Sequence, residues 1–229
     1  MSAASAPAIP IPTMALDARP SRYRYLRDPD AIRRASFDAI RREADLSRVT
    51  EDLRDIALRI AHAAGDVSVI ADLVASPEAV SLGRAALARG AGVLVDATMV
   101  AAGIAQGRLP ASNTVIATIG DDRVPDLARR LGSTRAAAAM ELWRPHLEGA
   151  VAVFGNAPTA LFHLLEMIDG GAPRPALVLG FPVGFVGAAE AKQALAENPV
   201  GIPFIALLGR RGGSAMAAAC VNALAFGLA

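Results

Sequence analysis

Short runs of apolar residues alternate with longer, helix-forming segments from about residue 90 onward. Five of the runs are continuously apolar: GVLVD (92–96), TVIAT (114–118), AVAVFG (150–155), PALVLG (175–180) and PFIALLG (203–209). A continuous run of this length is typical of a strand buried on both faces. The segments between them, such as STRAAAAMELW and APTALFHLLEMI, are mostly good helix formers. This alternation predicts right-handed βαβ crossovers, and therefore a three-layer α/β fold around a mainly parallel, five-stranded sheet.

The chain before residue 90 has helical periodicity instead. The segment 31–45 carries apolar side chains at near-helical spacing, at Ile32, Phe37 and Ile40. Thr50 opens a second helix, which Gly65 ends. Pro77 is expected at the first position of a third helix that ends at Gly90. We therefore predict a helical N-terminal lead-in to the sheet.

Composition and charge exclude several classes of protein. Of 229 residues, 53% are hydrophobic and 20% are charged, which excludes a disordered chain. A net charge of +1 provides no bulk field for nucleic acid or for an anionic membrane, so we expect neither as a partner. The single cysteine, Cys220, excludes a disulfide framework and a cysteine-based zinc site. Among 23 basic residues, Lys192 is the only lysine.

The two ends of the chain carry no targeting signal in this interpretation. Residues 1–20 are rich in alanine and proline and lack a basic start, so we expect a flexible extension rather than a signal peptide. Residues 21–229 are expected to form one domain. The uncharged stretch 212–229 contains Ser214 and Asn222 and is mostly small residues, which favours a buried helix over a membrane span. We expect a soluble, cytoplasmic protein.

The loops after the predicted strands are where an α/β fold binds its ligand. The glycines of the 180–187 loop have the spacing G-x-x-x-G-x-x-G, with Pro182 between them. This differs from the dinucleotide fingerprint G-x-G-x-x-G, and no G-x-x-x-x-G-K-[ST] occurs, so no nucleotide cofactor is expected. Two interpretations stay open: a tight turn without a ligand, and a turn whose backbone N–H groups bind an anion.

Three histidines are the candidates for acid–base chemistry, and no two of them have the H-E-x-x-H spacing of a zinc site, so no metal is expected. His62 lies near the end of the second predicted helix, with Arg59 three residues earlier on the same face. A neighbouring cation disfavours the charged imidazolium, so the charge of His62 would depend on a bound anion. His163, in an apolar helix, is expected to fill core or surface, and His146 to cap a helix end.

Five separated motifs occur in one order along the chain: YRYLRDPDAIRRASFDAIRREADLSR (23–48), RIAHAAG (59–65), GNAPTALFHLLEM (155–167), LGFPVGFVGAAEAK (179–192) and GRRGGSAMAAA (209–219). Together they resemble the precorrin-8X methylmutases of the cobalamin pathway, over residues 23 to 225. The resemblance implies an isomerase that moves a methyl group from C-11 to C-12 of precorrin-8X, giving hydrogenobyrinate without any cofactor. It also implies a homodimer with a flavodoxin-like parallel sheet.

The resemblance also implies roles for individual residues. The family's catalytic histidine lies in an R-x-x-H-x-x-G run and matches His62, and the arginine of that run matches Arg59. Ser36 matches a substrate-contacting serine in the family's first helix. Arg135 matches the arginine of the family's N-T-R-S-A-A-A run, although two neighbouring residues differ here. We expect His62 to protonate or hydrogen-bond the ring system, which makes it electron-poor and favours methyl migration.

The implied substrate is a flat, apolar macrocycle rimmed by acetate and propionate carboxylates. It requires an apolar slot with cations and N–H donors at its edge. The expected contacts are two arginines that pair with carboxylates and two turns that supply backbone N–H groups. These substrate-binding residues, in addition to Ser36, are Arg59, Arg135, Asn156, Thr159, Gly184 and Gly187.

Three alternatives remain open on the sequence. A related enzyme of the anaerobic route, cobalt-precorrin-8 methylmutase, acts on the cobalt-containing precursor, and no residue here distinguishes the two substrates. A nucleotide-binding oxidoreductase is an enzyme of a different class, against which the missing fingerprint counts. A tetrapyrrole carrier without catalytic activity is the third.

Overall fold

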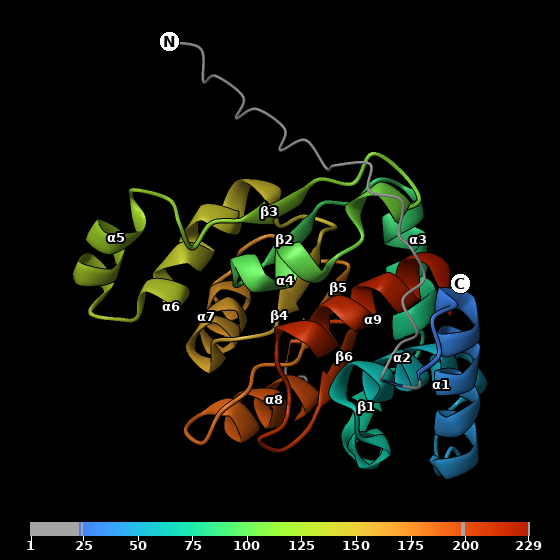
Figure 1. Ribbon diagram of the computed structural model, residues 1–229. Coiled ribbons are helices and arrows are strands. Elements are labelled where there is room, and N and C mark those ends of the chain that lie inside the picture. The colour runs from blue at the N-terminus through green and yellow to red at the C-terminus, as the bar shows by residue number, and fades with distance from the viewer. Residues whose placement is uncertain (1–22, 24, 198–199, 229) are drawn as a thin grey trace.

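Six strands form a single sheet in the order β1-β6-β5-β4-β2-β3 (Figure 1). The computed structural model describes residues 23, 25–197 and 200–228, so the expected extension over residues 1–20 lies outside the described part. The strands are β1 (Leu73–Ala75), β2 (Val93–Val95), β3 (Val115–Ala117), β4 (Val151–Phe154), β5 (Leu177–Gly180) and β6 (Phe204–Leu207). β2 to β6 pair in parallel and coincide with the five predicted runs. The predicted α/β class and parallel sheet are confirmed.

The strand count is the main difference from the prediction, because the sheet has six strands and not five. β1 lies at one edge and pairs antiparallel with β6, Leu73 opposite Leu207 and Ala75 opposite Ile205. Ser76 ends the pairing, since its N–H donates to the carbonyl of Phe204 and its hydroxyl accepts from the Phe204 N–H. A strand of three residues is too short to show a period of two, so the sequence pattern does not separate it from the apolar turn before it.

Helices cover both faces of the sheet (Figure 1). One face carries α2 (Arg54–Ala64), α3 (Ala79–Ala88), α4 (Thr98–Gly103) and α9 (Ser214–Phe226), with α1 (Pro29–Glu43) packed on α2. The other face carries α6 (Arg135–Met140), α7 (Pro158–Asp169) and α8 (Ala188–Glu197), with α5 (Val124–Leu131) beside α6. Short 3₁₀ turns complete the chain: η1 (Glu51–Leu53), η2 (Val67–Asp72), η3 (Gln106–Arg108) and η4 (Glu141–His146).

The alternation of side chains along each strand divides the core in two. Val93 and Val95 of β2 belong to the cluster with α2, α3, α4 and α9, whereas Leu94 belongs to the cluster with α6, α7 and α8. All three side chains are fully buried. Each strand of this kind is therefore apolar on both faces, which explains the continuous apolar runs and confirms the three layers.

The helices differ from the sequence prediction at two points, the start of α3 and the presence of α5. Gly65, at φ +65°, ends α2 as predicted. α3 begins at Ala79 and not at Pro77, because Glu78 adopts a left-handed conformation at φ +60°. α5 was not predicted from the sequence. It follows a turn at Asp121, whose carboxylate accepts the Arg123 N–H at 2.9 Å.

The small residues of the C-terminal helix allow it to approach the sheet closely. α9 buries Ala217, Ala218, Cys220 and Val221, which confirms that the uncharged C-terminal stretch contains a buried helix, over Ser214–Phe226. A Cβ on Gly155, after β4, would lie 2.9 Å from the Cβ of Ala217, so only glycine fits there. Within the described ranges, no helix is both long enough and apolar enough to span a bilayer.

Candidate active site

The loops that follow β4, β5 and β6 lie side by side at the carboxyl edge of the sheet, and they hydrogen-bond to one another. Gly213, after β6, donates its N–H to the carbonyl of Phe181 after β5, at 2.8 Å. Farther along the edge, the hydroxyl of Thr134, just before α6, lies 2.8 Å from the hydroxyl of Thr159 in the first turn of α7. The edge is therefore one connected surface built from segments far apart in sequence, as the ligand-binding rule for α/β sheets predicts.

His62 lies in the last turn of α2, and its ring packs on α1. The imidazole stacks on the ring of buried Phe37, with centroids 5.1 Å apart and an angle of 27° between the planes. A pocket of about 190 Å³ between α1 and α2 is lined by both His62 and Ser36, together with Gly65 and Asp66. The structure thus brings together two residues that the sequence places 26 positions apart, with the exposed His62 ring open to a ligand.

The Ser36 hydroxyl is already committed as a donor. Its Oγ donates to the carbonyl of Ile32, one turn earlier in α1, at 2.8 Å. A hydroxyl has one proton and two acceptor lone pairs. Ser36 can therefore accept a hydrogen bond from a ligand in the His62 pocket while it keeps this internal bond.

Arg59, three residues before His62, contacts the end of α9. Its Nε donates to the carbonyl of Gly227, and its guanidinium lies 4.8 Å from the centroid of Phe226. Arg108 lies over the same ring at 3.8 Å. Burial lowers the pKa of Arg59, and the charges of Arg108 and Arg33 lower it further. Arg59 therefore joins α2 to α9 in this structure, and its expected pairing with a substrate carboxylate stays a prediction.

Arg135 lies at the other end of the carboxyl edge. It is the first residue of α6, which Thr134 caps by accepting the Ala137 N–H, and its exposed guanidinium donates to the carbonyl of Ile119 after β3. Four strand spacings of about 4.8 Å separate β6 from β3, or about 19 Å. Arg135 does not line the His62 pocket of its own chain.

Asp96, directly after β2, is a site residue that the sequence analysis missed. Its buried carboxylate accepts three backbone N–H groups of the next loop, from Gly155 and Asn156 at 2.9 Å and from Ala157 at 2.8 Å. Burial raises the pKa of Asp96, and the three donors oppose that rise. These backbone N–H groups have Asp96 as their acceptor in this structure, and the expected contact of Asn156 with a substrate stays a prediction.

The glycine loop after β5 also makes contacts within the fold. Gly184 donates its N–H to the carbonyl of Arg210 at 3.2 Å, and the expected contacts of Gly184 and Gly187 with a substrate stay predictions. Gly187 has φ +80° and lies against Pro158. A Cβ added to Gly187 would lie 3.4 Å from the Pro158 Cβ. Thr159 uses its hydroxyl toward Thr134. What the loop does present to solvent is apolar: Phe185 is 84% exposed and Val186 is 90% exposed.

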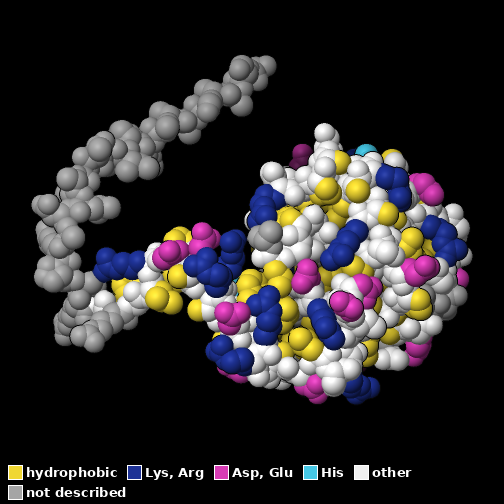
Figure 2. Space-filling view, turned by 90° about the vertical axis from the view of Figure 1, so that its right-hand side faces the viewer, with side chains coloured by type: hydrophobic (Ala, Val, Ile, Leu, Met, Phe, Trp, Pro, Cys, Tyr) yellow, Lys and Arg dark blue, Asp and Glu magenta, His cyan; other side chains and the backbone are white. Residues whose placement is uncertain are grey.

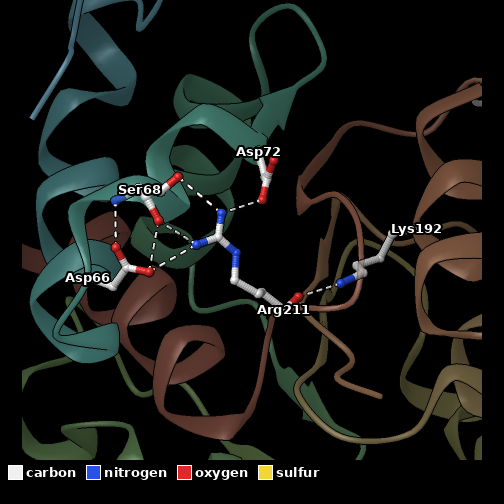
Figure 3. Close-up of polar contacts among 5 residues, drawn as sticks. All are labelled: Asp66, Ser68, Asp72, Lys192 and Arg211. Carbon is white, nitrogen blue, oxygen red and sulfur yellow. Dashed lines mark hydrogen bonds and ion pairs between the residues drawn. The ribbon is translucent and has the colours of Figure 1, made fainter. Parts of the chain in front are cut away.

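A polar cluster fixes the loop after β6 against the turn that follows α2 (Figure 3). The guanidinium of Arg211 contacts Asp66 at 3.0 Å, the Ser68 hydroxyl at 2.7 Å and Asp72 at 2.6 Å. From α8, the buried Lys192 donates to the backbone carbonyl of Arg211 at 2.5 Å. Asp66 lines the His62 pocket, so this cluster holds one wall of that pocket in place.

A larger cavity, of about 800 Å³, lies beside the edge strand β1. Its charged lining is one arginine and four acids: Arg48, Glu43, Asp45, Asp52 and Glu78. Glu43 lines the His62 pocket as well, so the two cavities are neighbours. On the face seen in Figure 2, basic and acidic side chains are interspersed, which fits a binding site made of local contacts in a protein of net charge +1.

The remaining histidines differ in their surroundings. His163 is mostly buried on α7, and its Nε2 lies 2.8 Å from a carboxylate oxygen of Glu141. It therefore makes a polar contact between α7 and η4. His146 ends η4 and is exposed. No cluster of three or more potential metal-ligating side chains occurs in the described part of the chain.

Comparison with known proteins agrees with this arrangement. The family model described as precorrin-8X methylmutase matches residues 31–226. A precorrin-8X methylmutase of Pseudomonas aeruginosa is 60% identical over 201 residues, covering 88% of this chain and 97% of that protein. One of Sinorhizobium is 57% identical, covering 89% and 97%. A cobalt-precorrin-8 methylmutase of Priestia megaterium is 36% identical, covering 86% and 87%.

A solved structure is similar over the same span. The precorrin-8X methylmutase of Thermus thermophilus superposes with a TM-score of 0.77 at 40% identity, covering 85% of this chain and 94% of that one. The motifs at residues 59–65, 155–167, 179–192 and 209–219 thus lie in matched sequence, and three of them meet at the carboxyl edge described above. The chain therefore belongs to the precorrin-8X methylmutase family and is an isomerase of cobalamin biosynthesis.

Proposed function

We propose that this enzyme moves a methyl group from C-11 to C-12 of precorrin-8X to give hydrogenobyrinate, with His62 as the proton donor. The observation that carries the proposal is the pocket that Ser36 and His62 share between α1 and α2. The imidazole is backed by Phe37 on one side and exposed on the other, so it can face a flat ligand. Ser36 adds an acceptor beside it.

The chemistry asks little of the protein beyond proton transfer and positioning. A proton or a strong hydrogen bond from His62 to the macrocycle withdraws electron density from its conjugated system. The methyl group then migrates with its bonding pair to the neighbouring carbon. Substrate and product are isomers, so no atom or electron enters or leaves overall, and His62 regains the proton that it donates. The two isomers also share every peripheral carboxylate, so we expect the product to bind tightly.

We assign the metal-free precursor as the substrate. The two relatives named for precorrin-8X are 57% and 60% identical to this chain, whereas the relative named for the cobalt-containing precursor is 36% identical. Cobalt-precorrin-8 is the alternative substrate. Comparing turnover of the two precursors under anaerobic conditions tests this assignment, and faster turnover of the cobalt form would overturn it.

We also propose a cytoplasmic homodimer, on the basis of the family resemblance. The separation along the sheet of the loops near His62 and Arg135 supports the dimer. About 19 Å of sheet edge separates the β6 loop beside the His62 pocket from the β3 end where Arg135 lies. A second copy that placed its Arg135 near His62 would complete a ring of cations around one substrate. Sedimentation analysis tests the dimer, and a monomer that is fully active at low concentration would contradict it.

The experiment for the proton donor compares His62→Ala with His146→Ala, an exposed histidine at the end of η4. We expect His62→Ala to lower turnover by about 100-fold or more, because a positioned acid or base contributes a factor of this order. The absorption change of the tetrapyrrole measures turnover, and a titration with hydrogenobyrinate measures binding. If His62→Ala binds substrate and turns it over at a near-normal rate, the role of His62 is wrong.

The same measurements separate the alternatives for the wild-type protein. Binding of the tetrapyrrole without spectral conversion would indicate a carrier. Quenching of the single tryptophan, Trp143, by a nicotinamide nucleotide would indicate the oxidoreductase.

A further inference from the structure

Two adjacent arginines after β6 have opposite surroundings. Arg211 is half-buried and contacts two acids and Ser68 (Figure 3). Arg210 is exposed, and no acidic side chain in the described ranges pairs with its guanidinium. The Arg210 guanidinium lies instead 5.4 Å from the ring centroid of Phe185. One of the two charges is thus neutralised within the fold, and the other is available to an anion.

Phe185 is unusual for an aromatic side chain, since 84% of it is exposed. An exposed large apolar group is informative where it belongs to a patch, and the neighbouring Val186 is 90% exposed. The loop that carries them is fixed rather than loose. Gly184 donates to the Arg210 carbonyl, and Gly213 donates to Phe181.

The pair also lies beside the proposed catalytic pocket. Arg211 contacts Asp66 at 3.0 Å, and Asp66 lines the pocket that contains His62. Consecutive Cα atoms are about 3.8 Å apart, so Arg210 emerges next to the wall that Arg211 anchors. A ligand that extended from this pocket along the carboxyl edge would therefore run toward Arg210 and Phe185.

We propose that Arg210 and Phe185 form a substrate-binding element, in which the ring covers part of the apolar macrocycle and the guanidinium pairs with one peripheral carboxylate. An aromatic ring and a guanidinium together match a ligand that is apolar in its centre and anionic at its rim. Both terminal nitrogens of the Arg211 guanidinium already donate within the fold, so we assign the substrate carboxylate to Arg210 and not to Arg211. This inference rests on the proposed function and adds a side-chain contact to it.

The experiment contrasts Arg210→Gln with Arg211→Gln, with Arg89→Gln as the matched control. Arg89 is exposed after α3, at the opposite edge of the sheet, where the chain enters β2. For each variant we measure the Kd for hydrogenobyrinate, the KM and kcat for precorrin-8X, and the Tm. For Arg210→Gln we expect Kd and KM to rise about tenfold, which is the loss expected for one charge-assisted hydrogen bond, with Tm unchanged and kcat largely retained. Phe185→Ala is expected to raise Kd in the same direction.

Arg211→Gln is expected to behave differently, with a lower Tm, because Asp66 and Asp72 lose their partner. A wild-type Kd and KM in Arg210→Gln would overturn the inference. A change in the association state with an unchanged Kd per site would overturn it too, because the pair would then contact a second copy of the chain. If the wild-type protein itself neither binds nor converts the tetrapyrrole, the failure lies with the proposed function, whereas failure confined to the variants lies with this pair.

Discussion

Removal of the Asp96 carboxylate is the sharpest test of how the carboxyl edge is built. Asp96 is 1% exposed and accepts the N–H groups of Gly155, Asn156 and Ala157. Asp96→Ala leaves all three donors without their acceptor at once. The loop that contains these N–H groups leads into α7, whose second residue is Thr159. The change therefore acts on a segment of the proposed site as well as on stability.

The magnitude follows from the hydrogen bonds lost. A buried donor left unsatisfied costs about 1–3 kcal/mol. A water molecule in the space left by the carboxylate has two lone pairs, so at least one N–H stays unsatisfied. The variant also removes the cost of burying a charge, the same cost that raises the pKa of Asp96. We expect a net loss of about 2–4 kcal/mol, which lowers the Tm of a domain of this size by about 4–16 °C.

The assay is urea unfolding followed by the fluorescence of Trp143, which is fully buried and packs 5.5 Å from Phe154 at the end of β4. Asp96→Asn keeps one acceptor oxygen and is expected to lose about half as much. Asp122→Ala, at an exposed carboxylate, is the control and should change stability by less than about 0.5 kcal/mol. If Asp96→Ala is as stable as Asp122→Ala at equal protein concentration, the N–H groups do not depend on Asp96 and the reasoning is refuted.

Two further predictions concern the same edge. Burial lowers the pKa of Lys192 from 10.5 to about 8, so between these values the unfolded chain binds a proton that the folded chain does not, and stability rises with pH. Wild type should gain about 1–2 kcal/mol in unfolding free energy between roughly pH 7.5 and 9.5, and Lys192→Met should lack that gain. If the unfolding free energy rises equally with pH in both proteins, Lys192 is not the group responsible. Gly212→Ala places a Cβ 2.4 Å from the Phe181 carbonyl, which should cost about 1–3 kcal/mol, while Gly120→Ala, with open space, should not.

The sequence was sufficient to predict strands that are buried on both faces and a helix that buries a complete apolar stripe. β2 to β6 and α2 are confirmed because continuous apolar runs and an i, i+3, i+4, i+7 stripe are produced by burial itself. β1 was missed because it directly continues the apolar turn η2, and α5 because the residues just before it, from Asp121, have the composition of a turn. Their placement is decided by contacts with β6 and α6, which no local pattern encodes.

The candidate site divides in the same way. The motif resemblance indicated His62 and Ser36, and the structure places them in one pocket, because α1 packs on α2. The acceptors of the Asn156 and Gly184 N–H groups could not be predicted, since Asp96 and the Arg210 carbonyl lie 60 and 26 positions away in the chain. The contrast between Arg210 and Arg211 could not be predicted from the sequence either. The two residues are identical and adjacent, and only the fold places Asp66 and Asp72 beside one and Phe185 beside the other.

The central position of α9 has a consequence for how the protein is made. α9 packs against α2, α3 and α4 and covers β4 and β5, yet it follows all six strands in the order of synthesis. Until residues 214–226 leave the ribosome, α2, α3 and α4 lack the helix that packs against all three, and one face of the sheet is only partly covered. Folding of the larger core therefore has to wait for residues 214–226, and until then the nascent chain exposes apolar surface of the kind that chaperones recognise.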